Sequence, residues 1–407
     1  MKKSLVALAS VLVCCAAQAQ SSVTLYGLAD IGITSVSGYT QGRVTSISSG
    51  ATEGSRWGMR GNEDLGGGYR ALFTFESRFE LDTGALGSRP ASLNQIPDRF
   101  TAGLLPAVAA AVNGAVGPTL GVNHVPGSQR LFDRQAFVGL VTPVGGILAG
   151  RQYTPGFEAL ATFDIMGVQT SLSPGQIISL PAGVDIRADN SLQYRIVAGG
   201  INAALMYSFG EDKTATSSGS KLLGINTIYK ADAFSVGFGY NTKKNAAGDQ
   251  SLKTTVLGAS GNLGAFTASG MYARIQEPNS FSAPALGAGL AGGGVPAPVI
   301  ADILDRLKQD ADLMHIGLRY NLGASGTVSV AYNRLNDKRG ANADVQSYGV
   351  AYTYPLSKRT NLNAVLTQVN NSANAQVAPG ANGYLGGVTK SAGTDSSSIS
   401  FGMRHSF

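Results

Sequence analysis

Residues 21–33, SSVTLYGLADIGI, decide how the rest of the chain is interpreted, because their hydrophobicity alternates at every second position. Apolar and small side chains share one face of this stretch, and the other face is mixed. The first face holds Val23, Leu25, Gly27, Ala29, Ile31 and Ile33, and the second holds Thr24, Tyr26, Leu28, Asp30 and Gly32. Successive side chains of a β-strand point to opposite sides. The stretch therefore predicts a strand with lipid or a neighbouring subunit on one side and water on the other.

The same alternation returns along the chain. It is found in residues 201–209, 234–240, 312–320 and 348–354, with Tyr and Phe gathered at the ends of these segments. Aromatic side chains prefer the two interfaces between membrane and water. Short alternating segments with aromatic ends are typical of β-strands that cross an outer membrane.

The connections between the segments are short and long in turn. Seven short ones predict turns at 62–67, 142–145, 198–200, 230–233, 262–264, 321–325 and 355–358. Eight long ones predict loops at about 35–50, 83–129, 152–186, 210–219, 244–250, 276–310, 337–344 and 370–394. These connections join sixteen strands, and the predicted fold class is therefore all-β, a sixteen-stranded antiparallel transmembrane β-barrel. An even count puts both ends of the chain on one side, and closure pairs the backbone groups that lipid would leave unsatisfied.

Two of the loops are longer than connections in compact domains usually are. Residues 83–129 are rich in Ala, Gly and Pro, and residues 276–310 contain a segment, 299–309, that could form a short helix. We interpret both loops as surface-exposed insertions. Contacts with a receptor, a phage or another partner are the alternative.

The N-terminus predicts a cleaved signal peptide at residues 1–19, followed by the barrel at 20–407. Two lysines precede an apolar stretch at residues 5–13, and Ala17-Gln18-Ala19 forms an A-x-A cleavage site. The apolar stretch is too short to span a bilayer. A lipoprotein acylated at Cys14 is the alternative, but Val11-Leu12-Val13 lacks the small residues of such a site.

The composition excludes several function classes. Both cysteines lie in the leader, so the mature chain has neither a disulfide framework nor a thiol nucleophile. Charged residues make up 14% of the chain, and no run of Lys or Arg indicates nucleic-acid binding. The chain has no G-x-S-x-G, H-E-x-x-H, P-loop or C-x-x-C motif, and the three histidines, His124, His315 and His405, lack metal-ligand spacing. We therefore expect neither an enzyme nor a metal or other cofactor, although calcium near Asp98 and Asp133 is conceivable.

Several motifs, taken in order, resemble a known family: the general porins of Gram-negative bacteria, in their β-proteobacterial branch. The similar stretches are SSVTLYGLADIGI (21–33), GSRWGMRGNEDLGGGYRALFTFE (54–76), RQAFVGL (134–140), GRQY (150–153), RADNSLQYR (187–195) and FGMRHSF (401–407). They cover both ends and the first half of the chain. The strands between them match mainly by pattern.

The resemblance implies that loop 152–186 folds inward and forms the pore constriction, with Glu158 and Asp164 as its acidic side chains. The loop lacks the Pro-Glu-Phe-Gly-Gly stretch of enterobacterial members, so an acidic position near residue 168 is missing. By motif, the family's wall arginines correspond to Arg56, Arg134 and Arg187.

The alternation of inward and outward side chains along the strands independently supports an inward position for these arginines. Arg56 shares a face with Gly54 and Gly58, and Arg187 shares one with Asp189 and Ser191. Arg134 and Phe137 fall on opposite faces of their strand, so Arg134 points inward if Phe137 points outward. The same alternation places the polar Gln135 outward.

Further side chains are predicted to line the pore in a secondary role. They are Glu76, Arg78, Arg60, Arg151 and Arg195. The alternative is that the arginines are paired with Glu76 or Asp64 and produce no net field.

As in the family, we expect a homotrimer in the outer membrane, with Gly27 and Ala29 near the trimer axis. Phe407 would be the signal read by the barrel-assembly machinery, and lipid and lipopolysaccharide would surround the wall. The function implied is passive diffusion of small hydrophilic solutes and ions, with weak to moderate anion selectivity. A channel specific for phosphate or organic acids remains an alternative, and a structural or adhesive barrel or a lipid-hydrolysing enzyme is less favoured.

Cleavage after Ala19 yields a testable expectation. The mature protein should begin at Gln20 and carry a formal charge of +4, since the leader takes Lys2 and Lys3 from the total of +6. The intact mass of the membrane-extracted protein checks this. A mass that fits a chain starting at an acylated Cys14 would establish the lipoprotein instead.

Overall fold

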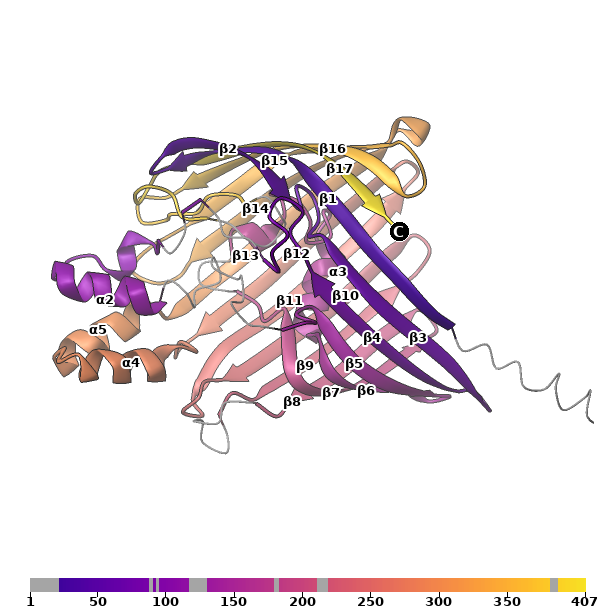
Figure 1. Ribbon diagram of the computed structural model, residues 1–407, viewed down its shortest axis with the longest axis horizontal. Coiled ribbons are helices and arrows are strands. Elements are labelled where there is room, and N and C mark those ends of the chain that lie inside the picture. Colours follow the sequence, from indigo (N-terminus) through magenta and orange to yellow (C-terminus); the bar gives the residue numbers. More distant parts are fainter. Residues whose placement is uncertain are drawn as a thin grey trace, which may run out of the picture.

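The computed structural model describes residues 22–87, 91–92, 95–116, 130–178, 183–210, 219–380 and 387–407, so the expected leader lies outside the described residues. These residues form one closed antiparallel β-barrel (Figure 1). Its strands are β1 (Ser22–Tyr39), β2 (Gly42–Ser49), β3 (Arg56–Gly66), β4 (Tyr69–Arg78), β5 (Gln135–Thr142), β6 (Gly145–Tyr153), β7 (Arg187–Ala198), β8 (Ile201–Ser208), β9 (Leu222–Lys230), β10 (Phe234–Lys244), β11 (Gln250–Leu263), β12 (Phe266–Glu277), β13 (Gln309–Asn321), β14 (Thr327–Asp337), β15 (Val345–Pro355), β16 (Thr360–Asn371) and β17 (Ser396–Ser406). Its helices are α2 (Pro106–Val116), α3 (Pro155–Phe163), α4 (Ala283–Gly292) and α5 (Ala297–Arg306), with short 3₁₀ turns η1 (Asp98–Phe100), η3 (Pro174–Gln176) and η4 (Gly323–Ser325).

The wall has sixteen strand positions, as predicted, because β2 and β3 lie end to end and share one of them. β2 pairs with the second half of β1, and β3 pairs with its first half. The expectation of a loop at 35–50 is wrong, since most of it continues the wall as a β-hairpin. Val44, Thr45 and Ile47 are β-branched and favour extended backbone. Gly42 takes the positive φ of +85° that follows the tight turn.

The barrel is closed by its first and last strands. β1 pairs antiparallel with β17 from Leu28↔Ser406 to Val36↔Ser398. Closure pairs the first strand of the wall with the last, so that neither is left as an edge strand in lipid. Phe407 extends this contact, because its N–H and C=O each bond to Gly27 at 3.1 Å. Its proposed part in assembly stays a prediction.

Side chains alternate across the wall as the sequence indicates. Outward residues of β1 are exposed, with Val23 at 68% and Leu25 at 61%, whereas the inward Asp30 is fully buried. β9 repeats the pattern residue by residue along its length. The outward apolar side chains are those that lipid or a neighbouring subunit would cover.

The short turns, the start of β1 and the end of β17 gather at one end of the barrel, and the longer loops gather at the other (Figure 1). Helices α2, α4 and α5 project from the latter end (Figure 1). They form a small core of their own, which includes Phe100, Val112, Leu290 and Ile303. The helix expected at 299–309 is therefore present as α5, and β13 already begins at Gln309. No helix among the described residues is long and apolar enough to cross a membrane.

Loop 152–186 folds into the barrel, as predicted, and α3 lies against the inner surface of strands β9 to β12. Glycines on that surface make room for it. A Cβ added to Gly258 would lie 2.2 Å from Cγ of Phe163, and one added to Gly239 would lie 2.4 Å from Cβ of Ala159. The inner wall is therefore shaped to receive this loop.

The last long loop also turns inward and rests on loop 152–186. Gln376 and Val377 are buried, and the N–H of Gly380 donates to Oε1 of Gln176 at 2.7 Å. The N–H of Val388 donates to Ser92 at 3.0 Å, which joins this loop to the first long insertion. Three loops that are far apart in the sequence are thus joined by hydrogen bonds.

The glycine contacts predict the effect of adding a single methyl group. Gly258→Ala should destabilise the barrel by about 1–3 kcal/mol, because the new Cβ overlaps Phe163. Gly261→Ala, on the same strand, is the matched control, because its added Cβ would lie 3.7 Å from the nearest atom, the backbone oxygen of Ala233. Thermal unfolding in detergent measures both, and equal midpoints for the two variants would contradict the packing argument.

Candidate functional site

A cavity of about 420 Å³ lies between loop 152–186 and the arginine-bearing wall. It is bordered by side chains from three regions of the chain: the segment before β3, the wall strands and the inward loop. The charged ones are Glu53, Arg56, Arg78, Arg134, Glu158, Arg187, Arg195 and Lys230. Three predicted wall arginines and the predicted loop acid Glu158 are therefore brought together.

Glu158 is held by the first turn of α3. Thr154 caps this helix by accepting the N–H of Phe157 at 3.3 Å, and Pro155 stands at its start. Glu158 accepts two hydrogen bonds from Nη2 of Arg195, each 2.6 Å long, and one from Asn226 at 2.9 Å. Its charge is thus matched directly by a wall arginine.

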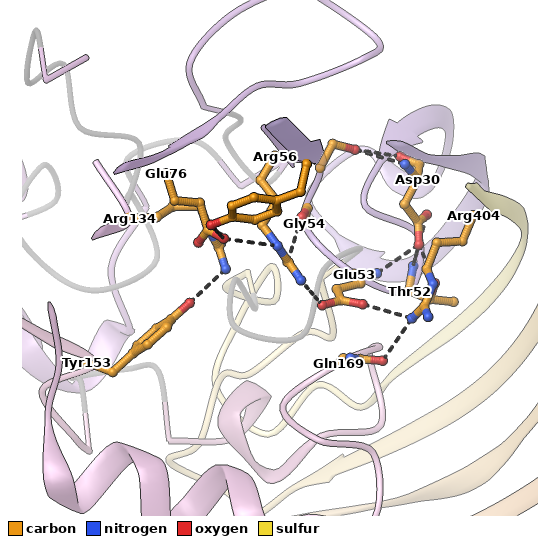
Figure 2. A network of polar contacts seen from close by, with 12 residues as sticks. Asp30, Thr52, Glu53, Gly54, Arg56, Glu76, Arg134, Tyr153, Gln169 and Arg404 are labelled. Atoms are coloured by element: carbon orange, nitrogen blue, oxygen red, sulfur yellow. Dashed lines mark hydrogen bonds and ion pairs between the residues drawn. The ribbon is translucent and has the colours of Figure 1, made fainter. Parts of the chain in front are cut away.

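Glu76 of β4 is the anchor for two of the predicted arginines (Figure 2). Nε of Arg134 donates to Glu76 Oε1 at 2.6 Å, and Nε of Arg56 lies 3.6 Å from Oε2. Tyr26 donates its hydroxyl to the same carboxylate at 3.1 Å. One acid therefore orients two cations, and Arg56 also pairs with Glu53.

Tyr153, at the end of β6, links Arg134 to Arg187. Its hydroxyl oxygen accepts Nη2 of Arg134 at 2.8 Å and Nη2 of Arg187 at 3.1 Å. The Arg187 guanidinium also lies 4.7 Å from the centre of the tyrosine ring, in cation–π geometry. A neutral side chain thus holds two like charges in place without cancelling either.

Of the arginines predicted to line the pore in a secondary role, some border the cavity and others lie outside it. Arg78 and Arg195 border the cavity. Arg151 instead donates to Asp133 O at 2.6 Å and pairs with Asp189, and Arg60 lies over the ring of Tyr26 at 5.2 Å. Of the described residues, six basic and two acidic side chains border the cavity.

Asp164 differs from the expectation that it forms part of the acidic edge. Its side chain has no exposed surface. The carboxylate accepts the N–H groups of Met166 and Val168 at 2.9 and 2.7 Å and the hydroxyl of Ser173 at 2.7 Å. Val168 and Thr170 have φ of +55° and +70°, which is unfavourable for β-branched residues. Asp164 therefore holds a strained turn together and does not face the pore.

The turn that Asp164 holds together is also bound by His315 of β13. Its Nε2 accepts the N–H of Ile165 at 3.0 Å, and its Nδ1 lies 2.6 Å from Oδ1 of Asn333. This pattern suits a neutral imidazole that donates from Nδ1. No group of three or more His, Cys, Asp or Glu side chains in the described part of the chain could hold a metal ion.

Sequence reasoning did not single out Glu53, Lys230, Tyr153 or Arg404. Arg404 was detectable, since alternation places it inward on β17, and it pairs with Glu53 at 2.8 Å. Glu53 lies between β2 and β3, outside any regular strand, so alternation does not indicate whether its side chain points inward or outward. Its place at the cavity follows from the path of the folded backbone alone.

Comparison with known proteins points in one direction. Residues 4–374 match the family model described as Gram-negative porin. The chain is 30% identical over 416 residues to outer membrane porin protein 32 of Delftia acidovorans, with 100% of both chains covered. It is 27% identical over 403 residues to an outer membrane porin protein of Bordetella pertussis, covering 88% of this chain and 91% of the relative.

Solved structures share the fold. The anion-selective porin from Comamonas acidovorans superposes with a TM-score of 0.71 at 23% identity, covering 95% of this chain and 100% of that one. OmpT of Vibrio cholerae superposes with a TM-score of 0.60 at 12% identity, covering 95% and 98%.

The role of Asp164 can be tested through the steadiness of the current. Asp164→Ala should increase current fluctuations in single channels, because three buried donors lose their acceptor at a cost of about 1–3 kcal/mol each. Asp164→Asn keeps one acceptor oxygen and should show smaller current fluctuations than Asp164→Ala. An alanine variant with wild-type noise would remove Asp164 from this role.

Proposed function

Because the chain belongs to the Gram-negative porin family and is an outer-membrane β-barrel, we propose that it forms a water-filled channel for passive diffusion of small hydrophilic solutes, with a preference for anions. The observation that carries the anion preference is the excess of basic over acidic side chains around the cavity. Members of this family are channels, and selection in a channel depends on pore width and on the charges along it.

The charges act through the local field. Arginine stays protonated at any working pH, so the cationic side of the cavity is permanent. Clustered charges beside a low-dielectric wall raise the local concentration of ions of opposite sign. Glu53, Glu76 and Glu158 each neutralise at most one cation and are held against specific arginines, whereas six basic side chains border the cavity. The alternative of a fully compensated field is therefore disfavoured. The name of the Comamonas acidovorans structure, an anion-selective porin, agrees with this proposal.

The proposed roles of individual residues follow from their places. Arg56, Arg134 and Arg187 form the cationic side of the constriction, and Glu158 forms its acidic counterpart on the loop. Arg195 and Arg78 contribute from the wall. We propose no direct pore role for Asp164.

The assembly proposed is a homotrimer, with the outward face of the first strands towards the other subunits. Ile33, Ile47, Phe401 and Met403 border an apolar groove on the outside of the barrel, next to the β1–β17 seam. Such a face needs cover by a subunit or by lipid. Lipid and lipopolysaccharide would surround the remaining wall, and Phe407 would be read by the barrel-assembly machinery. A leader at residues 1–19 would direct export.

The anion preference is tested by the reversal potential of the purified protein in a planar bilayer under a KCl gradient. The wild-type potential should have the sign of an anion-selective channel. Arg56→Glu should lower the Cl⁻/K⁺ permeability ratio roughly 15-fold at low salt, because a change of two unit charges about 10 Å from the path changes each ion's concentration about fourfold.

Arg359→Glu, with the same charge change at an exposed turn, is the matched control. A cation-selective wild type would overturn the proposal, and equal effects of the two substitutions would remove Arg56 from the constriction. Conductance that saturates with one anion, such as phosphate, would establish the substrate-specific alternative.

A further inference from the structure

The barrel wall is interrupted where residues 50–55 leave it, between β2 and β3. Ala51 turns towards the inside and lies over the β1–β17 seam. Gly32 and Gly402, which are partners across this seam, provide the space: Cβ atoms added to them would lie 2.8 and 3.0 Å from Cβ of Ala51. We call residues 50–55 the inward segment.

Asp30 of β1 holds the inward segment in place. Its carboxylate accepts the N–H groups of Thr52 and Glu53, the latter at 2.9 Å, and also the Thr52 hydroxyl. Its backbone N–H donates to Ser55 Oγ at 3.0 Å, and its C=O accepts the N–H of Gly50 at 2.7 Å. Asp30 is fully buried, and these bonds fix both ends of the inward segment.

The inward segment also meets the tip of loop 152–186. The N–H of Thr170 donates to the C=O of Thr52 at 2.7 Å. Gln169, from the same tip, lies 3.5 Å from Nη1 of Arg404. Two inward elements from distant parts of the sequence thus join and border the same cavity (Figure 2).

Glu53 is placed by this junction between two cations of the wall. It pairs with Arg56 on one side and with Nη1 of Arg404 on the other, at 2.8 Å for the latter. Its side chain is 15% exposed and borders the cavity. Glu158, by comparison, is bound to Arg195 on the other side of the loop. Glu53 is therefore an acid of the cavity that does not come from the constriction loop.

We propose that the inward segment is a second constriction element and that Glu53 limits the strength of the anion preference. The inference rests on the proposed function, since it concerns the selectivity of the same channel. The carboxylate of Glu53 offsets part of the positive charge of Arg56 and Arg404. Removal of this one negative charge should leave Arg404 without its ion-pair partner and Arg56 with only Glu76, which Arg56 shares with Arg134.

The test is the reversal potential of Glu53→Gln, which keeps the size and hydrogen-bonding reach of the side chain. The Cl⁻/K⁺ permeability ratio should rise about fourfold over wild type at low salt, since one unit charge roughly 10 Å from the path in water changes each ion's concentration about twofold. Glu63→Gln, exposed and of outward parity on β3, is the matched control and should leave the ratio unchanged.

A double variant separates the charge effect from a loosened fold. Glu53→Gln with Arg404→Gln restores the wild-type net charge and should return the ratio close to wild type. Sheet-type circular dichroism and heat-dependent gel migration check that each variant is folded.

Each outcome has one meaning. An anion-selective wild type with an unchanged Glu53→Gln ratio overturns the role of Glu53 and leaves the proposed function standing. A Glu53→Gln shift that the double variant does not reverse also overturns it, because the shift then comes from a displaced segment. A wild type without anion preference refutes that part of the proposed function, whereas the shift between Glu53→Gln and wild type still decides whether Glu53 lowers the Cl⁻/K⁺ permeability ratio.

Discussion

The wall of this protein depends on one constraint: inside a bilayer, every backbone N–H and C=O must find a partner within the protein. The pairing of β1 with β17 meets it for the first and last strands, which would otherwise be edge strands. Because the wall is then one pleated sheet with lipid outside and water inside, side chains must alternate in polarity. The exposed Val23 and Leu25 and the buried Asp30 of β1 are direct consequences.

The same closed wall explains how the interior is organised. A barrel of this size leaves a wide lumen, and selectivity requires that something narrow it. Loop 152–186 does so by packing Phe163 and Ala159 against wall glycines, while the inward segment enters where the wall is interrupted. Charges carried by rigid, packed elements keep fixed distances. Glu53, Glu76 and Glu158 each bind particular arginines, and the remaining positive charge faces the water.

Local sequence was sufficient for the wall because strand periodicity is a local property. Alternation from residue 22 onward, short turns and the count of sixteen positions all agree with the structure. The hairpin at 35–50 was misjudged because its Ser- and Gly-rich composition resembles that of a loop. Its extended form is stabilised by pairing with β1, a partner that composition does not reveal.

Sequence alone thus determined the barrel, the inward parity of Arg56, Arg187 and Arg404, and, through motif resemblance, the family. Only the tertiary structure decided which charges meet. Asp164 and Glu158 lie six residues apart on one loop, yet one is buried beneath a turn and the other borders the cavity. Glu53 reaches the cavity because Asp30 and Thr170 hold its backbone there. Parity is set by each residue's own strand, whereas the distance between charges depends on contacts between segments far apart in the chain.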